Sequence, residues 1–161
     1  MAYTVNAPRI GVQPIATKST TAKHPLGTLV QANDPTYGDG IFMYVKGVAS
    51  AESKEWCTWD QHAGAIVRAA ANGKGTVGIT VNTLTASYYG WIARKGVVTG
   101  QCLTAHADNG KVFFTGTAGA VDDASVAGDL ISGAVARALT VADSGVTLFE
   151  LDMPFATDAD S

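Results

Sequence analysis

The sequence predicts a mainly β protein: a small, single-domain, sandwich or barrel-like fold with an extended N-terminal arm and at most one or two short helices. Three observations carry this prediction. A chain of 161 residues with 47 % hydrophobic and 16 % charged side chains is sufficient for one packed core. The chain contains 18 glycines, which suit many tight turns. Its apolar segments are short and are separated by Gly, Asp and Asn, which is typical of strands joined by turns.

Residues 1–25 are expected to form the arm. Prolines punctuate this segment, and proline removes a backbone donor and biases the preceding residue toward an extended conformation. No helical period is present, and the apolar side chains of the segment favour an arm that lies on a surface. The prolines are Pro8, Pro14 and Pro25, and the apolar residues are Ile10, Val12 and Ile15.

Beyond the arm, the chain is a series of predicted strands. Alternation is clearest in one of them, where Trp91 and Ala93 point to one side and Ile92 and Arg94 to the other. The expected strands are 27–32, 41–48, 55–60, 75–81, 90–98, 101–107, 111–116, 129–139 and 145–152.

Two segments, 60–71 and 122–139, are also compatible with a helix. The second has apolar residues at helical spacing, but Gly128 and Gly133 inside it would each cost about 1 kcal/mol relative to alanine. We therefore expect a strand over 129–139.

Charge divides the chain into an arm (1–25), a β-rich domain (26–152) and an acidic C-terminal tail (153–161). The net charge of −3 argues against a protein that coats nucleic acid. Residues 1–25 carry three bases and no acid, whereas residues 139–161 carry five acids and no base. The two ends could pair within one chain or between neighbours. The bases are Arg9, Lys18 and Lys23, and the acids are Asp143, Glu150, Asp152, Asp158 and Asp160.

Nothing in the sequence indicates secretion or a membrane. The first residues lack the charged and apolar regions of a signal peptide, and no stretch approaches the roughly 20 apolar residues of a membrane helix. Cys57 and Cys102 are the only cysteines, so no disulfide framework is indicated. We expect synthesis in a cytoplasm and neither a membrane nor a nucleic-acid partner.

The loop "NDPTYGDG" (33–40) places Asp34 and Asp39 beside glycines, as some cation sites do. An EF-hand loop needs oxygen ligands at alternating positions and a closing bidentate acid, and neither requirement is met. We interpret the loop as a turn. The apolar run after it (41–48) predicts a strand covered on both faces, by the core and by a partner subunit.

Two cysteines and two histidines, Cys57, His62, Cys102 and His106, nominally form a zinc ligand set. In extended chain, which rises about 3.3 Å per residue, each Cys–His pair would be separated by roughly 13–16 Å. The expectation is therefore no metal and no cofactor, with buried cysteines and ordinary histidines.

Catalytic signatures are absent from the sequence: there is no G-x-S-x-G, H-E-x-x-H or P-loop motif. Asp122 and Asp123 are adjacent, so on a strand they face opposite ways, and we interpret them as turn acids. We expect no enzymatic activity. A small β enzyme using Cys57 or Cys102 with a histidine remains a third hypothesis.

Aromatic residues are the other candidates for a binding surface. Exposed rings could bind sugars or a protein partner, whereas buried rings would belong to the core, and the sequence leaves both interpretations open. The residues are Trp56, Trp59, Tyr88, Tyr89 and Trp91.

The order of these segments resembles the head decoration, or cement, proteins of tailed phages. The resemblance is carried by "HPLGTLVQANDPTYGDGIFMYVKGVAS", by "VGITV…YYGWIARKGVV" and by "AGDLISGAVARA", and it covers most of residues 20–152. It implies a β-rich virion protein that binds the outer surface of the expanded capsid and stabilises it. The implied partners are the major capsid protein and the chain itself, as a homotrimer at three-fold and quasi-three-fold positions.

The resemblance also implies a role for the arm, because such proteins often use an N-terminal arm to complete a sheet on the capsid surface. The residues expected to contact the capsid are Pro8, Arg9, Ile10, Val12, Pro14 and Ile15. The alternative function is a carbohydrate- or receptor-binding β-module of the virion, which would use the aromatic residues above.

Overall fold

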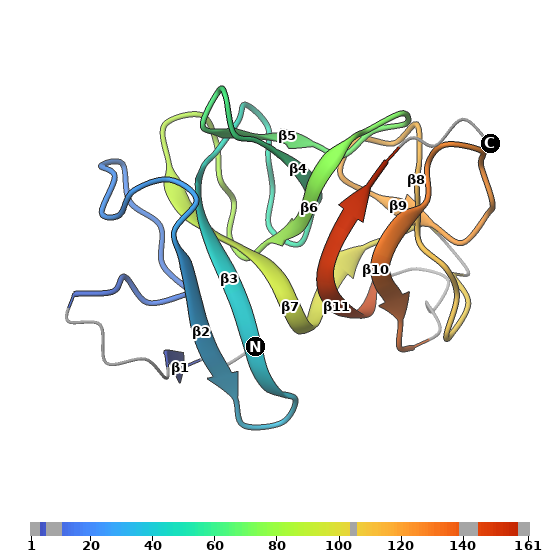
Figure 1. The fold of residues 1–161 in the computed structure, drawn as a ribbon, viewed down its shortest axis with the longest axis horizontal. Helices are drawn as coiled ribbons and strands as arrows, with labels where there is room; N and C mark the ends of the chain where they lie inside the picture. Colours follow the sequence, from blue (N-terminus) through green and yellow to red (C-terminus); the bar gives the residue numbers. More distant parts are fainter. Residues whose placement is uncertain (1–3, 6–10, 104–105, 139–144, 158–161) are drawn as a thin grey trace.

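The computed structural model describes residues 4–5, 11–103, 106–138 and 145–157 (Figure 1). These residues form strands and contain no helix, and hence none long and apolar enough to cross a membrane. The predicted mainly β fold is confirmed. The strands are β1 (Thr4–Val5), β2 (Leu29–Asp34), β3 (Gly38–Lys46), β4 (Trp56–Asp60), β5 (Ala65–Arg68), β6 (Gly75–Thr80), β7 (Tyr89–Gln101), β8 (Phe113–Phe114), β9 (Val121–Asp122), β10 (Ile131–Ala136) and β11 (Val146–Ala156).

Five strands close on themselves and form what we call the barrel. They pair in the order β3–β5–β4–β6–β7, and β7 also pairs with β3. Closure between β3 and β5 depends on one parallel pair, Lys46 with Ala65. In Figure 1 the barrel surrounds the centre of the view, with β3 to the left, β5 and β4 above, β6 to the right and β7 below.

The long strand β7 belongs to two parts of the sheet. Its first half pairs with β3, and its second half, from Lys95 to Gln101, pairs antiparallel with β11. At its far end β11 leaves β7 and pairs with the start of β6 through Phe155 and Ala156. β6, β7 and β11 therefore meet at a three-strand junction. β10 continues the sheet beyond β11, and the small β8–β9 hairpin contacts it through a bridge between Phe113 and Leu130.

The two faces of β7 pack against different cores, as the alternation predicts. Trp91 and Ala93 belong to the larger core, which extends from the N-terminal segment to β10 and β11. Ile92 faces the barrel interior, where the chain is so close-packed that a Cβ on Gly78 would lie 2.9 Å from Ile92 Cδ1. The buried residues of the interior cluster are Met43, Val45, Ala51, Cys57, Ile66, Leu84 and Ile92.

The acidic loop is the turn between β2 and β3, as predicted. Asp34 Oδ1 accepts hydrogen bonds from the backbone nitrogens of Thr36 (2.8 Å) and Tyr37 (3.1 Å), so this carboxylate stabilises the turn. The following strand is covered on both faces, because Phe42 belongs to the larger core and Met43 to the barrel interior. Both cores belong to the chain itself, so no partner subunit is needed to cover β3.

Neither segment with helical spacing forms a helix. Residues 60–71 contain a turn and β5. The preferred prediction of a strand within 129–139 is confirmed for residues 131–136, which form β10. Gly133 has φ +78° at a register shift between β10 and β11, and a Cβ there would lie 2.6 Å from the Asp152 carbonyl oxygen. This glycine therefore forms a bulge in a strand. The expected strand at 101–107 is wrong for its described residues after Gln101, where β7 ends; residues 104–105 lie outside the described residues.

Candidate functional site

Residues 11–25 of the N-terminal segment lie on the body of their own chain. Gln13 is its centre: its carbonyl accepts a hydrogen bond from Trp91 Nε1 at 3.2 Å, and its backbone nitrogen donates to His24 Nε2 at 3.0 Å. The Tyr44 hydroxyl donates to Gln13 Oε1 at 3.3 Å. Further along, Ser19 exchanges two backbone hydrogen bonds with Tyr89. Residues 11–25 are thus integrated into the fold.

This placement corrects part of the predicted capsid-contacting set. Ile15 is 3 % exposed and belongs to the larger core, so it is not available to a partner, and Val12 packs against the same core. Pro14 is exposed. The remaining three residues of the set, Pro8, Arg9 and Ile10, lie outside the described residues.

The described charges at the two ends of the chain do not pair with one another. Glu150 accepts a hydrogen bond from Arg137 at 2.6 Å, and Asp152 accepts one from Lys95 at 3.0 Å. Lys18 of the N-terminal segment instead donates to the Thr83 carbonyl at 3.0 Å. The two described acids of this end therefore pair with bases of the β-rich domain.

The aromatic residues do not form a common exposed platform. Trp56 and Trp91 are fully buried in the larger core, so the expectation of exposed contacts is wrong for both. Trp59, Tyr88 and Tyr89 are half-buried. The ring of Tyr88 is covered by Lys18, whose Nζ lies 4.4 Å from the ring centroid. A sugar-stacking surface built from all five rings is excluded by this arrangement.

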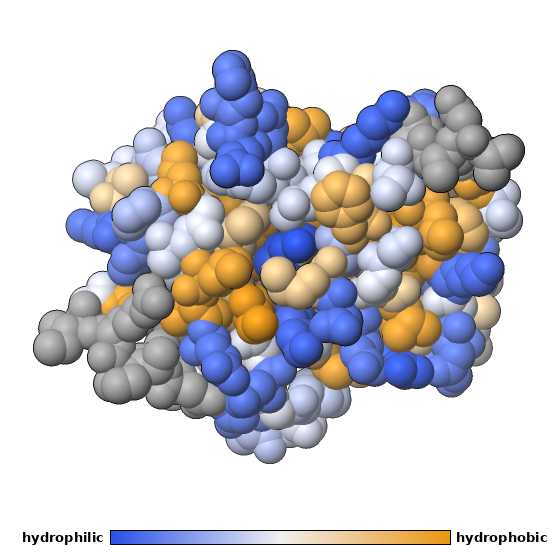
Figure 2. All heavy atoms as spheres, viewed as in Figure 1, coloured by the Kyte–Doolittle hydropathy of each residue, from blue (hydrophilic) through white to orange (hydrophobic). Residues whose placement is uncertain are grey.

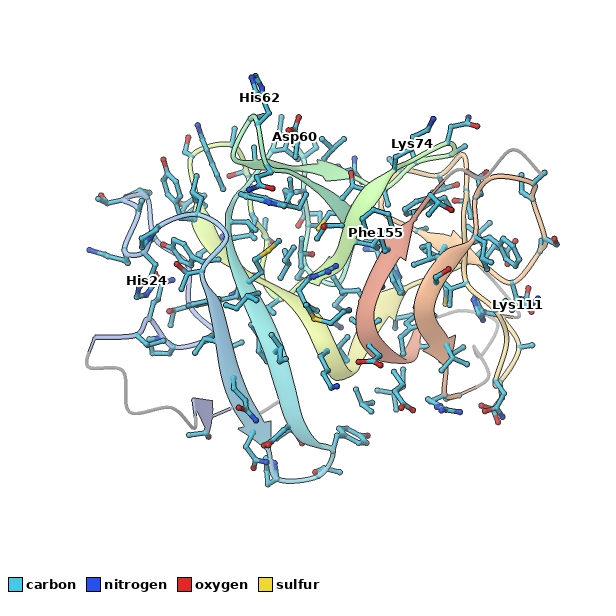
Figure 3. The ribbon with its side chains drawn as sticks, in the orientation of Figure 1. His24, Asp60, His62, Lys74, Lys111 and Phe155 are labelled. Atoms are coloured by element: carbon cyan, nitrogen blue, oxygen red, sulfur yellow. The ribbon has the colours of Figure 1, made fainter. Side chains whose placement is uncertain are left out.

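The cysteines and histidines are also dispersed. Cys57 faces the barrel interior, whereas Cys102 belongs to the larger core. His62 is exposed at the tip of the turn between β4 and β5 (Figure 3), and His106 is buried against Phe149, with ring centroids 5.4 Å apart. Among the described residues no cluster of three or more His, Cys, Asp or Glu side chains is placed to hold a metal ion.

Neither cysteine is placed as a nucleophile. Burial raises the pKa of the Cys57 thiol to about 12, which suppresses the thiolate at neutral pH. Cys102 is 4 % exposed. Asp123 likewise has a structural role: its carboxylate accepts a hydrogen bond from the Ala107 backbone nitrogen at 2.8 Å, and this bond lowers the pKa of Asp123.

We expect both thiols of the native protein to be unreactive toward a disulfide reagent at pH 8, and both to react once the chain is unfolded in guanidinium. The reason is burial of both sulfur atoms together with the raised pKa of Cys57. Absorbance after mixing measures the number of reactive thiols. Rapid stoichiometric labelling of one thiol in the folded protein would contradict this expectation and restore the cysteine-enzyme hypothesis.

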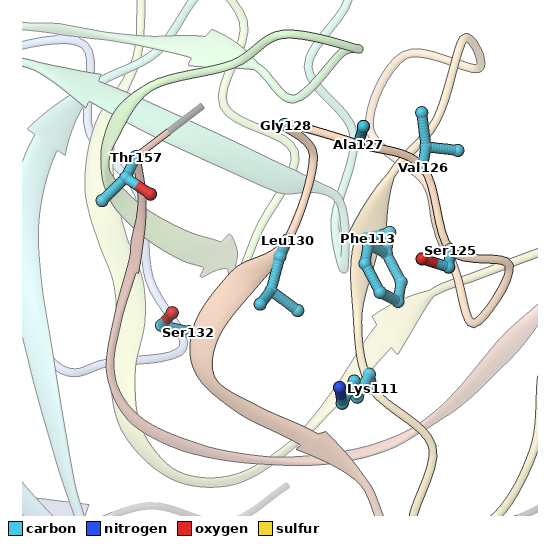
Figure 4. Close-up of a pocket in the computed structure, with 9 residues that line it drawn as sticks. All are labelled: Lys111, Phe113, Ser125, Val126, Ala127, Gly128, Leu130, Ser132 and Thr157. Atoms are coloured by element: carbon cyan, nitrogen blue, oxygen red, sulfur yellow. The ribbon is translucent and has the colours of Figure 1, made fainter. Parts of the chain in front are cut away.

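Two hollows in the described surface are candidate binding sites. The first, of about 260 Å³, lies between the 125–130 loop and β10 (Figure 4). Its polar side chains, Lys111, Ser125, Ser132 and Thr157, are all solvent-exposed. This hollow therefore lacks a buried polar group that could select a ligand.

The second hollow, of about 290 Å³, lies at one end of the barrel and is called the barrel mouth here. Arg94 of β7 lines it, although the residue is only 5 % exposed. Burial lowers the pKa of Arg94 to about 10, and the guanidinium is still charged at neutral pH. The other lining residues are Leu26, Gly27, Leu29, Met43, Trp59, Gln61, Thr76 and Met153.

Arg94 was not among the sequence-based site candidates. The available signal was the alternation in β7, which places this arginine on the same side of the strand as Ile92. Since Ile92 faces the barrel interior, a charged residue two positions later must lie inside the barrel or at its opening.

Comparisons with family models, with curated proteins and with solved structures find no match for the chain.

Proposed function

We propose that the protein is a capsid decoration protein of a tailed phage, which binds the outer surface of the expanded head and stabilises it. The sequence resemblance is the starting point of this proposal. The structural observation that supports it is the position of the chain's N-terminal residues: Thr4 and Val5 pair as an added strand with Asn33 and Ala32 at the edge of the sheet.

This edge is suited to binding by strand addition. In the described residues β1 pairs with Asn33 and Ala32 of β2 and forms the outermost strand of the sheet. An extended segment of the major capsid protein could add to the sheet beside β1, with main-chain hydrogen bonds supplying affinity.

Stabilisation of the shell follows from mass action. A protein that binds the assembled shell, and not its separated subunits, shifts the equilibrium toward the assembled state. Homotrimers of this chain would contact the capsid protein at many equivalent positions of the shell. These weak contacts add through multivalency. This mechanism requires no catalytic group and no cofactor.

Co-sedimentation with expanded heads stripped of this protein tests the proposal. The full chain should bind saturably, and a chain beginning at Gly11 should bind about tenfold more weakly, which corresponds to about 1.4 kcal/mol. A start at Pro25 would be a poor comparison, because it removes Ile15 from the core and also removes Gln13, which accepts a hydrogen bond from Trp91. Equal unfolding midpoints of the two chains serve as the control. Failure of the full chain to bind would overturn the proposal.

A further inference from the structure

We propose that the barrel mouth binds a carboxylate side chain flanked by apolar residues on a protein partner, with Arg94 as the group that recognises the carboxylate. That the partner is the capsid shell rests on the function proposed above. The recognition chemistry rests on the barrel mouth alone.

The hydrogen bonds of Arg94 leave much of its guanidinium for a ligand. A guanidinium has five N–H donors. In the described structure Arg94 donates only through Nη1, to the Val77 carbonyl and to the Pro154 carbonyl at 2.7 Å. These carbonyls belong to β6 and β11, so Nη1 ties the three-strand junction together. The donors on Nε and Nη2 are not used by these bonds.

No carboxylate of the described residues forms an ion pair with Arg94. This is unusual for a buried cation, because a charge removed from water is unfavourable unless an opposite charge accompanies it. The anion that the fold does not supply can come from a ligand. Arg94 lines an open hollow, so such a ligand has access to it.

The size and lining of the barrel mouth favour a carboxylate over a phosphate. Among the described residues that line the hollow, Arg94 is the only charged one, and most of the others are apolar. One guanidinium balances one carboxylate, and its planar donors match the two carboxylate oxygens. A phosphate would bring nearly two negative charges into an apolar site with a single cation.

The surroundings of the hollow favour a protein as the source of the carboxylate. Leu26, Leu29 and Met153 line it and are 39 %, 44 % and 40 % exposed. On the face of the molecule shown in Figure 2, apolar side chains lie on both sides of a small hydrophilic area near the centre. Phe155, which is 46 % exposed, lies on the same face (Figure 3). Exposed apolar groups around one buried charge are typical of a protein docking surface.

Met153 also adopts φ +51°, a conformation that is unfavourable for a residue with a side chain. The side chain of Met153, a flexible thioether, lines the hollow. Methionine adapts its shape to a bound apolar group, which suits this position.

A titration with hexanoate tests the recognition chemistry on the full-length protein. The methyl resonances of Met43 and Met153, which both line the hollow, should shift saturably, with a dissociation constant of about 1 mM for so small a ligand. 1-Hexanol, which has the same tail without the charge, should bind about tenfold more weakly. Leu29→Glu, which introduces a competing carboxylate, should abolish the shifts. Equal binding of hexanol and hexanoate, or no saturable shift, would overturn the proposal.

Arg94 itself is a poor choice for substitution, because Nη1 also binds two carbonyls and its loss would disturb the junction. Leu29→Glu has a matched control in Val67→Glu. Val67 is 52 % exposed on β5 and does not line the hollow. Both variants make the same change of charge at an exposed apolar position.

Head binding by these two variants tests the partner. Leu29→Glu should weaken co-sedimentation with stripped heads about tenfold or more, whereas Val67→Glu should bind like the unchanged protein. If Leu29→Glu binds normally, the barrel mouth does not dock on the shell and this proposal fails, while the decoration function stands. If the unchanged protein does not bind heads, the decoration function and the shell as partner both fail. If hexanoate binds tightly while Leu29→Glu binds heads normally, the ligand of the barrel mouth is a small carboxylate molecule and not a side chain of the shell, and the proposal of a protein partner fails.

Discussion

Trp91→Ala is expected to lower the free energy of unfolding by about 4 kcal/mol, as large-to-small changes of fully buried aromatic residues do. Trp91 is 0 % exposed and packs against Tyr44 and His24, with ring centroids 5.0 and 5.5 Å away. Its indole nitrogen also holds the Gln13 carbonyl. The substitution therefore removes core volume and the main attachment of the N-terminal segment in one step.

The loss of stability in Trp91→Ala should be largest in the N-terminal segment. Trypsin should cleave the folded variant after Lys18 and Lys23 much faster than it cleaves the unchanged protein, because both exposed lysines lie in the released segment. Urea unfolding measures the stability, and mass spectrometry identifies the cleavage sites. Trp91→Phe, which keeps most of the ring and loses the N–H donor, should lose only about 1–2 kcal/mol.

Trp59→Ala is the matched control, because Trp59 is half-buried at the barrel mouth, away from Gln13. It should leave cleavage after the two lysines unchanged. If Trp91→Ala shows the same resistance to trypsin as Trp59→Ala, then Trp91 does not hold the segment, and another contact such as the Ser19–Tyr89 pair does so.

The β-rich fold could be predicted because local sequence determines it. Alternation in β7 assigned Trp91 and Ala93 to one face and Ile92 to the other, and the two cores follow that assignment. Proline spacing correctly excluded a helix in the described N-terminal residues. Glycine at position 133 favoured a strand, since its conformation suits a bulge better than the middle of a helix.

The sites could not be predicted, because they depend on contacts between residues far apart in sequence. Gln13 and Trp91 are 78 residues apart, and no local pattern shows that an indole will hold an arm-like segment on the body. The junction around Arg94 exists because β6 pairs with β7 at one end and with β11 at the other. Register of this kind is set by the whole sheet. Exposure of single aromatic residues has the same dependence, which explains why the sequence leaves the burial of Trp56 and Trp91 open.

The N-terminal segment and the barrel mouth would have different roles in binding. The segment is held by neutral hydrogen bonds and apolar packing around Gln13 and Ile15, so its attachment should depend little on salt. The barrel mouth would bind through one charge, so its contribution should weaken as salt rises. Strand addition beside β1 would supply affinity, and the carboxylate at Arg94 would fix the orientation of the docked protein.

Gly119→Ala is expected to lower the free energy of unfolding by about 2–4 kcal/mol, although it adds only one methyl group. Gly119 has φ +82°, which an alanine adopts at a penalty of about 1–2 kcal/mol. A Cβ at this position would also lie 2.6 Å from Glu55 Cδ. The added carbon therefore collides with a buried carboxyl group.

Glu55 cannot move aside without losing its partners. It is 2 % exposed, and its carboxylate accepts hydrogen bonds from Arg68 Nε at 2.9 Å, from Arg68 Nη2, and from the Glu52 backbone nitrogen at 3.0 Å. Displacing it would leave a buried carboxylate without its arginine partner, which is unfavourable. The backbone of Gly119 is fixed as well, because it exchanges hydrogen bonds with Trp56 and Ala69.

Gly116→Ala provides the matched control. Gly116 is exposed, its φ is not positive, and a Cβ there has no atom within 4 Å, so its effect should stay within about 0.5 kcal/mol. Urea unfolding of both variants measures the difference. In a double-mutant cycle, Glu55→Ser should remove the collision, so that Gly119→Ala loses less stability in that background than alone. Strict additivity of the two changes would show that the strained backbone, and not the buried carboxylate, accounts for the effect.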